Sequence, residues 1–480
     1  SRGLGDVYKR QEYDIAGSTP YGRDPMPALA AAMRAHGLRF GFYFSQSQDW
    51  SKPGGRPDWF KGLEGDWDAY VEQHAVPQLR HLLGGTYGDI DVLWFDSGSV
   101  TKSQEGAQKI WAELAAQPDI LVNNRLKFGP RGDFDTPEQW VPPTVQTNRP
   151  WETCMTMNGS WGYNPTDPEW KSSTTLIRNL CLVVSRGGNY LLNVGPRADG
   201  SLEPEVPERL RETGAWMQVN AESIYGTRAN PLGHVRWGTV TWKPVEDGSR
   251  IYCHVFDWPQ SGRIRVPLDG TPRSARWLGA PQDRPAWTRD EYGLVLSLGR
   301  KGPVHPAVSV LVLDLPDVPP ASLPLVARVA EDGVIKVLAV EAQVEGGVHV
   351  DHRKPRLDGW HGKHQDQRLA RWRVQGPDEA RAYRVRARYG LNTDQDTSRM
   401  RFVVRLAGQA VEIPVEVTGV EPDHHNREIN QLVMADAVAE GMIRLPPGVH
   451  DVELTDVGAP EAFTKPKGRQ NKILCHSGFA

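Results

Sequence analysis

Asp96 stands where a reactive carboxylate could act, directly after the apolar run 90–95, which we interpret as a buried strand. A carboxylate that leaves such a strand beside the indole of Trp94 would be partly desolvated, and it could attack an anomeric carbon as a nucleophile. The alternative is that Asp96 caps the turn that follows, through residues 97–99. The position of Asp96 alone leaves both interpretations open.

Two further carboxylates, Glu138 and Glu152, follow in sequence that we interpret as irregular. Retaining glycoside hydrolysis needs two carboxyl groups roughly 5–5.5 Å apart, one ionised as the nucleophile and one protonated as the acid. A loop glutamate could supply the second group, or each glutamate could simply be solvated. The same stretch holds four tryptophans, typical of a mouth that stacks on sugars or of a loop packed by its own aromatic rings: Trp140, Trp151, Trp161 and Trp170.

Helices and strands alternate through the first half of the chain. The pattern predicts helices near residues 24–37, 67–83, 104–116 and 173–186, and strands over 38–45, 90–96, 120–125 and 189–194. A longer helix over 207–220 closes the region. This alternation favours a parallel (β/α) barrel, in which reactive side chains gather where the strands end.

After residue 227 the hydrophobic period becomes that of short strands, for example over 250–256 and 307–313. We expect a partial barrel over 12–228, an antiparallel β-sandwich over 229–315, a proline-rich linker over 316–325 and a second β-sandwich over 326–480. The second sandwich is predicted from runs such as 401–406 and 411–417.

Composition excludes several classes of protein. With 39% hydrophobic and 24% charged residues and a net charge of −3 over 480 residues, the chain is globular and carries no global positive field for nucleic acid or an anionic membrane. No apolar run approaches the roughly 20 residues of a membrane span. Four cysteines without a CxxC pair argue against a disulfide framework or a structural zinc site. Six C-terminal histidines could bind a metal but are better explained as solvated surface: His349, His352, His361, His364, His424 and His425.

Five motifs in order resemble the α-L-fucosidases of glycoside hydrolase family 29. They are Gly-Phe-Tyr-Phe-Ser at 41–45, Leu-Trp-Phe-Asp at 93–96, Thr-Pro-Glu-Gln at 136–139, Trp-Glu-Thr-Cys at 151–154 with Ser-Trp-Gly-Tyr at 160–163, and Gly-Asn-Tyr-Leu-Leu-Asn-Val-Gly-Pro at 188–196. The resemblance spans residues 13–315. Residues 326–460 resemble, more weakly, a carbohydrate-binding jelly roll.

The resemblance implies a retaining exo-α-L-fucosidase that hydrolyses terminal α-L-fucose from fucosylated oligosaccharides or glycans by double displacement. It implies that Asp96 is the nucleophile, that Trp94 lines the fucose pocket, and that Tyr43 and Arg125 occupy pocket positions at neighbouring strand ends.

For the acid/base, the resemblance favours Glu138, with Glu152 as the second candidate. Glu152 and Trp161 are expected at the substrate. No metal or organic cofactor is implied, because two carboxylates and a pocket that stabilises an oxocarbenium ion suffice.

The chain also departs from the family pattern. The family's early strands, with their Phe-Gly, His-Trp-Gly and His-His signatures, find no match, and the first adjacent histidines are His424 and His425. Residues 1–11 match no family segment, and we interpret them as a non-native leader. The expectation is therefore an incomplete (β/α)8-like barrel with impaired turnover, whose full-length form is secreted or periplasmic. Two alternatives remain open, a non-catalytic carbohydrate-binding protein and a retaining glycosidase for another sugar.

Overall fold

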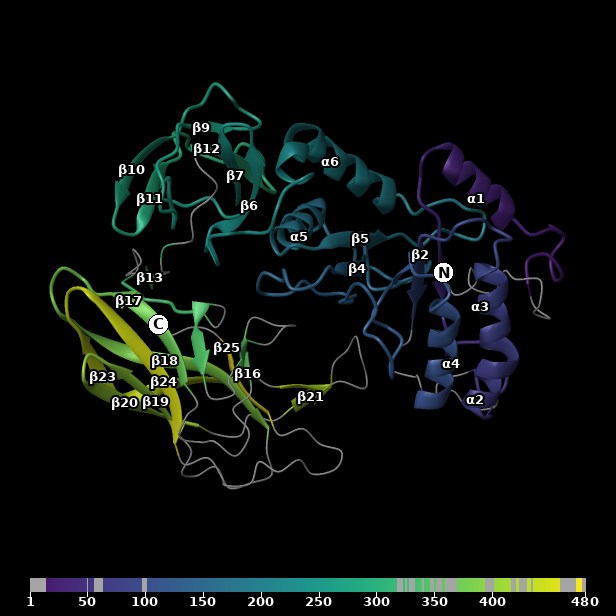
Figure 1. Cartoon of the computed structure of the whole chain (residues 1–480). Coiled ribbons are helices and arrows are strands. Elements are labelled where there is room, and N and C mark those ends of the chain that lie inside the picture. Colours follow the sequence, from purple (N-terminus) through teal and green to yellow (C-terminus); the bar gives the residue numbers. More distant parts are fainter. Residues whose placement is uncertain are drawn as a thin grey trace. The chain divides into compact units, whose positions relative to one another are not determined.

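The computed structural model describes residues 14–49, 51–55, 64–96 and 102–316, together with shorter stretches between 323 and 476. The chain divides into two compact units (Figure 1). Unit 1 comprises residues 1–139, 147–170 and 188–208, and unit 2 comprises residues 140–146, 171–187 and 209–480. Each unit is described by itself below.

Unit 1 contains the helices predicted before residue 120. They are α1 (Met26–Ala35), a continuous helical stretch formed by α2 (Trp67–Tyr70), the π-helical η1 (Val71–Ala75) and α3 (Val76–Leu83), and then α4 (Gln104–Leu114). Side chains cap their first turns, because the first amide groups of a helix lack partners inside it. Asp66 accepts a hydrogen bond from the Asp68 amide at 2.9 Å, and Ser103 accepts one from the Gly106 amide at 3.0 Å.

The strands of unit 1 are parallel. β1 (Gly41–Phe44), β2 (Val92–Phe95) and β3 (Leu121–Val122) form one sheet, and β4 (Glu152–Thr156) pairs with β5 (Asn189–Asn193). Residues 134–138 connect the two sheets through three parallel bridges: Asn123 with Phe134, Asp135 with Trp151, and Glu138 with Cys154. The strands therefore follow one another across the array in chain order, as the alternating pattern predicts.

Glu152 thus belongs to a strand of this array and not to irregular sequence, whereas Glu138 lies outside the strands and is joined to the array by a single bridge. Glu152 is the first residue of β4, and Glu138 is bridged to that strand at Cys154. The prediction of irregular structure was wrong here because the strand 152–156 holds a glutamate, two threonines and a cysteine, so it lacks the apolar run that marks the other strands.

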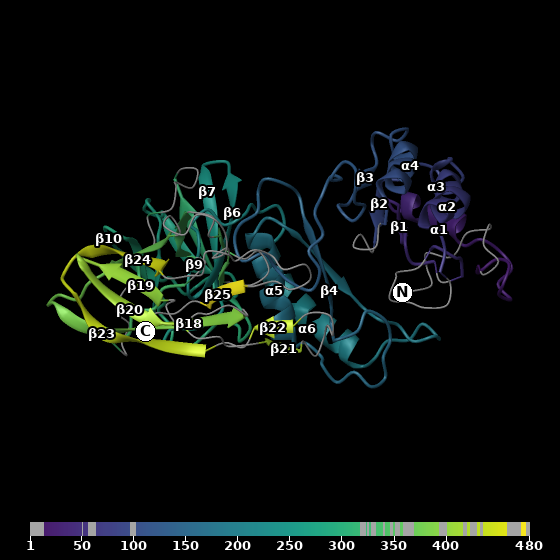
Figure 2. The same ribbon diagram turned by 90° about the horizontal axis from the view of Figure 1, so that it is seen from below.

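One face of the β1–β3 sheet packs against the helices (Figures 1 and 2). Its buried side chains include Phe42, Phe44, Leu93, Phe95 and Val122. The other face of the array is open, with 43% of Tyr43, 51% of Leu121 and 44% of Leu191 exposed. Alternate residues of a strand point to opposite faces, so the same short strands serve both the core and the open face.

Unit 2 begins with α5 (Ser173–Ser185), most of α6 (Glu205–Asn220) and the short 3₁₀ helix η3 (Ala221–Ser223). A four-stranded antiparallel sheet follows, in the order β6 (Gly238–Val245), β7 (Gly248–Val255), β12 (Ser309–Leu315) and β9 (Ser274–Trp277). It shares a core with β10 (Ala286–Asp290), β11 (Gly293–Ser297) and β8 (Arg263–Val266). Trp216 of α6 donates its indole hydrogen bond to the Val308 carbonyl at 2.9 Å, which fastens the helix to the first sheet.

The rest of unit 2 is β-structure around a second core. One sheet contains β13 (Val326–Ala327), β14 (Gln343–Glu345), β17 (Leu369–Gln375), β19 (Arg401–Leu406), β20 (Gln409–Pro414) and β24 (Val449–Val457); the other contains β15 (His349–Val350), β16 (Arg356–Asp358), β18 (Arg381–Asn392), β23 (Ala435–Leu445) and β25 (Lys472–His476). A separate pair joins β21 (Val420–Pro422) to β22 (Asn430–Leu432). Pairing is antiparallel except between β13 and β17. The predicted strand-only region is confirmed, while five of the six C-terminal histidines lie outside the described residues: His352, His361, His364, His424 and His425.

The two faces of the β1–β3 sheet give a direct test of this packing. Leu93→Ala removes a fully buried side chain, and we expect it to lower the free energy of unfolding by about 2–5 kcal/mol. Leu121→Ala, on the adjacent strand, is the matched control and should change it by less than about 0.5 kcal/mol, because this leucine is half exposed. Denaturant unfolding followed by tryptophan fluorescence measures both. Equal losses would contradict the assignment of faces.

Candidate active site

The carboxyl ends of β1, β2 and β3 place the predicted residues side by side. Tyr43 on β1 lies opposite Trp94 on β2, and Asp96 follows β2 directly. The Asp96 amide donates a hydrogen bond to the Phe44 carbonyl at 3.1 Å, so the ladder holds the backbone of Asp96 up to the point where its side chain leaves the sheet. Parallel strands present their carboxyl ends at one edge, which explains this gathering.

Arg125 is the centre of the site. Its Nη1 donates to Asp96 Oδ1 at 2.8 Å and to Glu138 Oε2 at 2.7 Å. Its Nε donates to Thr136 Oγ1 at 2.9 Å, and its Nη2 lies 3.5 Å from Cys154 Sγ. Only 13% of the Arg125 side chain is exposed, against 24% for Asp96 and 42% for Glu138. A largely buried cation therefore joins a half-buried carboxylate to one that is open to solvent.

Asp96 is held through both of its oxygens. Oδ1 accepts from Arg125, and Oδ2 accepts from the Tyr43 hydroxyl. Tyr43 also stacks on Trp94, with ring centroids 5.5 Å apart and planes inclined by 17°. The Arg125 guanidinium carbon lies 4.5 Å from the centroid of the same Trp94 ring, within the range of a cation–π contact. These contacts fix both the position and the rotation of the Asp96 carboxylate.

The shared nitrogen sets the distance between the two carboxylates. Asp96 Oδ1 and Glu138 Oε2 lie 2.8 Å and 2.7 Å from Arg125 Nη1, so the gap between these oxygens cannot exceed the two distances combined. That upper limit lies below the roughly 6.5–9.5 Å spacing typical of an inverting pair.

The surroundings shift several pKa values. Burial lowers the pKa of Arg125, but the charges of Glu138 and Asp96 more than offset this effect and raise it above the usual value. Burial raises the pKa of Glu152, while the Trp94 indole and the Arg125 charge oppose the rise. Burial also raises the pKa of the Cys154 thiol to about 11, so this thiol is neutral at physiological pH. The site thus combines a largely buried cation with one carboxyl group whose pKa is raised by burial.

Five of the seven predicted site residues are joined by direct contacts: Tyr43, Trp94, Asp96, Arg125 and Glu138. Glu152 lies near enough to Trp94 and Arg125 for both to affect its pKa. No contact described here joins the Trp161 side chain to this group. The Trp161 carbonyl instead accepts a hydrogen bond from the Asn193 side chain at 2.7 Å, at the end of β5.

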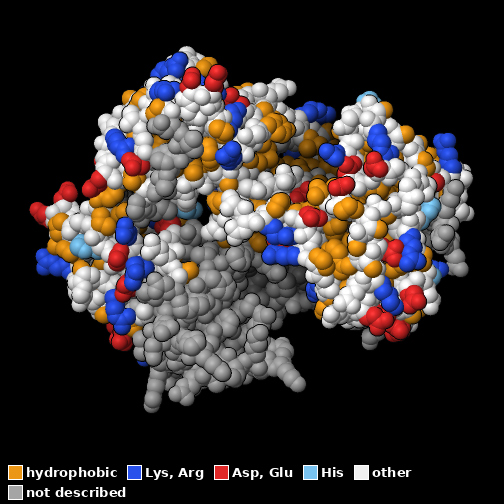
Figure 3. Space-filling model, in the orientation of Figure 1, with side chains coloured by type: hydrophobic (Ala, Val, Ile, Leu, Met, Phe, Trp, Pro, Cys, Tyr) orange, Lys and Arg blue, Asp and Glu red, His pale blue; other side chains and the backbone are white. Residues whose placement is uncertain are grey.

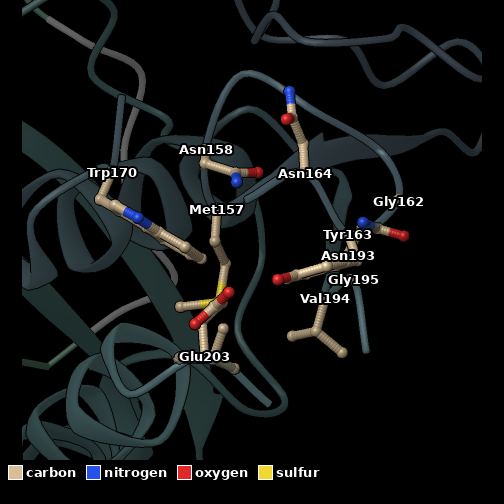
Figure 4. Close-up of a pocket in the computed structure, with 11 residues that line it drawn as sticks. Met157, Asn158, Gly162, Tyr163, Asn164, Trp170, Asn193, Val194, Gly195 and Glu203 are labelled. Carbon is tan, nitrogen blue, oxygen red and sulfur yellow. The ribbon is translucent and has the colours of Figure 1, made fainter. Parts of the chain in front are cut away.

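A separate pocket lies beyond the ends of β4 and β5 (Figure 4). Its lining includes Tyr163, Trp170, Asn158 and Glu203. In Figure 4 the Trp170 ring points in toward Met157. Glu203 is paired with Arg197 across 2.5 Å, so its charge is already balanced. Gly162 and Tyr163 directly follow Trp161 and line the pocket, so the loop that holds Trp161 borders it.

Sequence reasoning missed the asparagines before Arg125. Asn123 is fully buried; its Nδ2 donates to the Phe95 carbonyl at 2.8 Å, and its Oδ1 accepts from the Phe95 amide at 3.2 Å. Asn124 Oδ1 accepts from the amide and the hydroxyl of Thr136 at 3.1 and 2.9 Å. The signal was present: two amide side chains in succession at the end of a strand, next to an arginine, exceed what a turn requires.

Three more observations concern the described part of the molecule. No group of three or more histidine, cysteine, aspartate or glutamate side chains there could hold a metal ion. None of the described helices is long and apolar enough to cross a membrane. On the face shown in Figure 3, acidic and basic side chains are interspersed across the described surface.

Comparison with known proteins identifies the family. A family model described as Alpha-L-fucosidase matches residues 8–222. The structure of α-L-fucosidase isoenzyme 1 from Paenibacillus thiaminolyticus is 31% identical, with a TM-score of 0.55, over 66% of this chain and 82% of that one. The chain belongs to the α-L-fucosidase family. An α-L-fucosidase from Bacteroides thetaiotaomicron, assigned to glycoside hydrolase family 29, is 25% identical over 64% of this chain and 74% of its own, with a TM-score of 0.55. The resemblance predicted from the five motifs is confirmed.

The match differs in extent between relatives. The tissue α-L-fucosidase of Rattus norvegicus is 28% identical over 322 residues, and the chain spans 63% of its length. An α-L-fucosidase structure from Vibrio sp. strain EJY3 aligns with 97% of this chain and 81% of its own at a TM-score of 0.71 and 23% identity. This last likeness shows that the fold of the family member extends over nearly the whole chain, including the C-terminal β-structure.

Glu152 yields a prediction about pH and stability. Because the folded protein binds the Glu152 proton more tightly than the unfolded chain, this group favours folding fully below the usual pKa of about 4.5 and progressively less as pH rises through the raised value. Glu152→Gln cannot ionise, so its melting temperature should gain on that of the wild type as pH increases from 4 to 7. Glu105→Gln, on exposed α4 surface, is the control and should show a constant difference. A constant difference for Glu152→Gln as well would contradict the assignment.

Proposed function

We propose that this chain is a retaining exo-α-L-fucosidase that releases terminal α-L-fucose from fucosylated oligosaccharides or glycans by double displacement. The observation that carries the proposal is the pair Asp96 and Glu138 on one nitrogen of Arg125, which keeps their nearest oxygens closer together than the carboxyl groups of an inverting pair. Family membership supports the sugar. A trapped covalent intermediate is known for the Bacteroides thetaiotaomicron member in complex with 2-fluoro-fucosyl fluoride, which supports the double displacement.

In the first step, an Asp96 oxygen attacks the anomeric carbon of fucose, and the bond from that carbon to the leaving oxygen breaks. The leaving oxygen takes the proton of Glu138. In the second step, ionised Glu138 accepts a proton from water, whose oxygen attacks the anomeric carbon and releases Asp96. Each carboxyl thus ends in its starting state. Arg125 and Tyr43 orient Asp96 through their hydrogen bonds.

The remaining residues have proposed binding roles. Trp94 presents an aromatic surface beside Asp96, and stacking of such a ring on a sugar face is a common mode of recognition. Tyr43 and Arg125 are proposed to line the pocket beside Asp96. Glu152 and Trp161 are proposed to contact the substrate farther along the array. No metal or organic cofactor enters these steps.

Glu152 is a second candidate for the acid/base, and one observation favours it. An acid catalyst must carry a proton, and burial raises the pKa of Glu152. In favour of Glu138 stand its direct link to the Asp96 pair and its exposure, which lets it reach both a leaving group and water.

The parallel array is proposed to be an incomplete (β/α)8-like barrel over residues 12–228. β-sandwich domains over 229–315 and 326–480 follow, joined by the linker 316–325, and the second is proposed to be carbohydrate-binding-like. Strands that pair in chain order, with one face on helices and the other open, support the barrel. The open face also supports the expectation of impaired turnover, because a closed barrel would cover Leu121 and Leu191.

The nucleophile is tested with Asp96→Gly. We expect this variant to lose turnover of an aryl α-L-fucoside, because no carboxylate remains to attack the anomeric carbon. Added azide should restore part of the rate and yield the β-fucosyl azide, since a small anion can enter the vacated space. Turnover and product configuration are measured by absorbance and NMR. Turnover equal to that of the wild type would refute the assignment.

The acid/base is tested with Glu138→Ala and Glu152→Ala on two fucosides that differ in leaving group. Glu138→Ala should slow the substrate with the poor leaving group by roughly 10²–10⁴-fold and the activated aryl fucoside far less, because only the former needs a proton on departure. Glu152→Ala should affect both alike. The opposite pattern would exchange the two roles. A wild-type chain that binds fucosylated glycans without cleaving either substrate would instead support a non-catalytic carbohydrate-binding protein.

A further inference from the structure

The segment before and including Glu138 pairs with β4 in a regular parallel ladder. The Glu152 amide donates to the Asp135 carbonyl at 2.9 Å, and two residues further along the Cys154 amide donates to the Pro137 carbonyl at 3.3 Å. In the other direction, the Gln139 amide donates to the Cys154 carbonyl at 2.9 Å. Continued by the same two-residue step, the ladder would join the Thr156 amide to the Gln139 carbonyl.

At that step a side chain takes over from the backbone. The Thr156 amide donates to Oε1 of Gln139 at 3.3 Å, and Nε2 of Gln139 donates to Thr156 Oγ1 at 2.9 Å. Gln139 has a φ of 62°, a left-handed conformation that is uncommon for residues other than glycine, and it turns the main chain away from β4. The carboxamide therefore occupies the place that the next peptide group would have filled.

The bonds of the Gln139 carboxamide to Thr156 also constrain Glu138, the residue before Gln139. Thr136 and Glu138 are two residues apart in an extended segment, and both contact Arg125. Gln139 closes the segment on its far side, so rotation of the backbone at Glu138 would break the bonds to both Cys154 and Thr156. Backbone held in a sparsely populated conformation persists where the surroundings determine it, and it occurs preferentially beside functional groups.

The same device occurs at the other carboxylate. The Asn123 carboxamide bonds the amide and the carbonyl of Phe95, the residue before Asp96. Next to Asp96, the backbone of Phe95 is bonded by the Asn123 carboxamide. Next to Glu138, Gln139 supplies the carboxamide that bonds Thr156. Two independent occurrences in one site indicate a function in positioning.

We propose that Gln139 is a positioning residue for Glu138: its carboxamide replaces a peptide group in the ladder to Thr156 and thereby keeps the Glu138 carboxylate within reach of the departing oxygen. This inference rests on the proposed function, and it assigns the acid/base role to Glu138.

The kinetic test uses the full chain with Gln139→Ala. We expect kcat for the fucoside with the poor leaving group to fall by about 10- to 100-fold, less than the full contribution of a general acid, with KM and the activated aryl fucoside changed less than about threefold. Gln139→Asn keeps a residue that tolerates φ near 60° but shortens the carboxamide, so it should resemble Gln139→Ala. The matched control is Gln117→Ala, whose carboxamide bonds the Leu83 carbonyl at 3.4 Å before β3; it should match the wild type.

Hydrogen exchange supplies a readout that needs no turnover. The peptide that contains Thr156 should exchange faster in Gln139→Ala than in the wild type, and Gln117→Ala should leave it unchanged. Equal losses on both fucosides, unchanged kinetics or unchanged exchange would each overturn the inference. If the wild type cleaves neither fucoside, the proposed function fails and the positioning role with it, whereas an unaffected Glu138→Ala in an active chain overturns this inference alone.

Discussion

The arrangement depends on one guanidinium nitrogen shared by two carboxylates. Without Arg125, Asp96 and Glu138 would face each other as like charges in a partly desolvated site, where repulsion between them would move one side chain or protonate it. A buried arginine is costly unless its donors are satisfied. Thr136 Oγ1 and Cys154 Sγ accept from two other nitrogens of the Arg125 guanidinium. The Gln46 side chain donates to the Arg125 carbonyl at 3.3 Å. The cation is thus held through both its side chain and its backbone, and the two carboxylates take their positions from it.

Side chains build the edge of the sheet around that cation. β3 has only two residues, because Asn123 and Asp133 supply bonds that main-chain groups supply in longer strands. Asp133 accepts from the Val122 amide at 2.7 Å through its carboxylate and donates from its own amide to the Val122 carbonyl. A strand that ends early leaves its edge free for functional side chains, while the carboxylates and carboxamides keep neighbouring backbone amides paired. The short strand and the dense polar site therefore arise together, because the side chains that replace main-chain bonds at the end of β3 are part of the site.

The sequence predicts the parts of this structure that follow from local pattern. Helices and strands of unit 1 follow from hydrophobic period, and Asp96, Tyr43 and Arg125 meet because parallel strands end at one edge. Local sequence pattern does not predict the pairing of residues 134–138 with β4. Pro137 donates no amide hydrogen bond and Gln139 turns left-handed. Their partners on β4 are Cys154 and Thr156, each seventeen residues downstream. Contacts of this kind are chosen by tertiary structure, so neither propensity nor spacing contains them.

The two glutamates illustrate how environment divides roles between like groups. Glu138 contacts the Arg125 guanidinium and is 42% exposed, so it can exchange protons with water. Glu152, in contrast, is the first residue of β4 and is partly buried. Burial raises the pKa of Glu152, although the Trp94 indole and the Arg125 charge both act to lower it. Because its side chain is exposed, Glu138 is open both to a departing oxygen and to water, while its ion pair with Arg125 Nη1 keeps it beside Asp96.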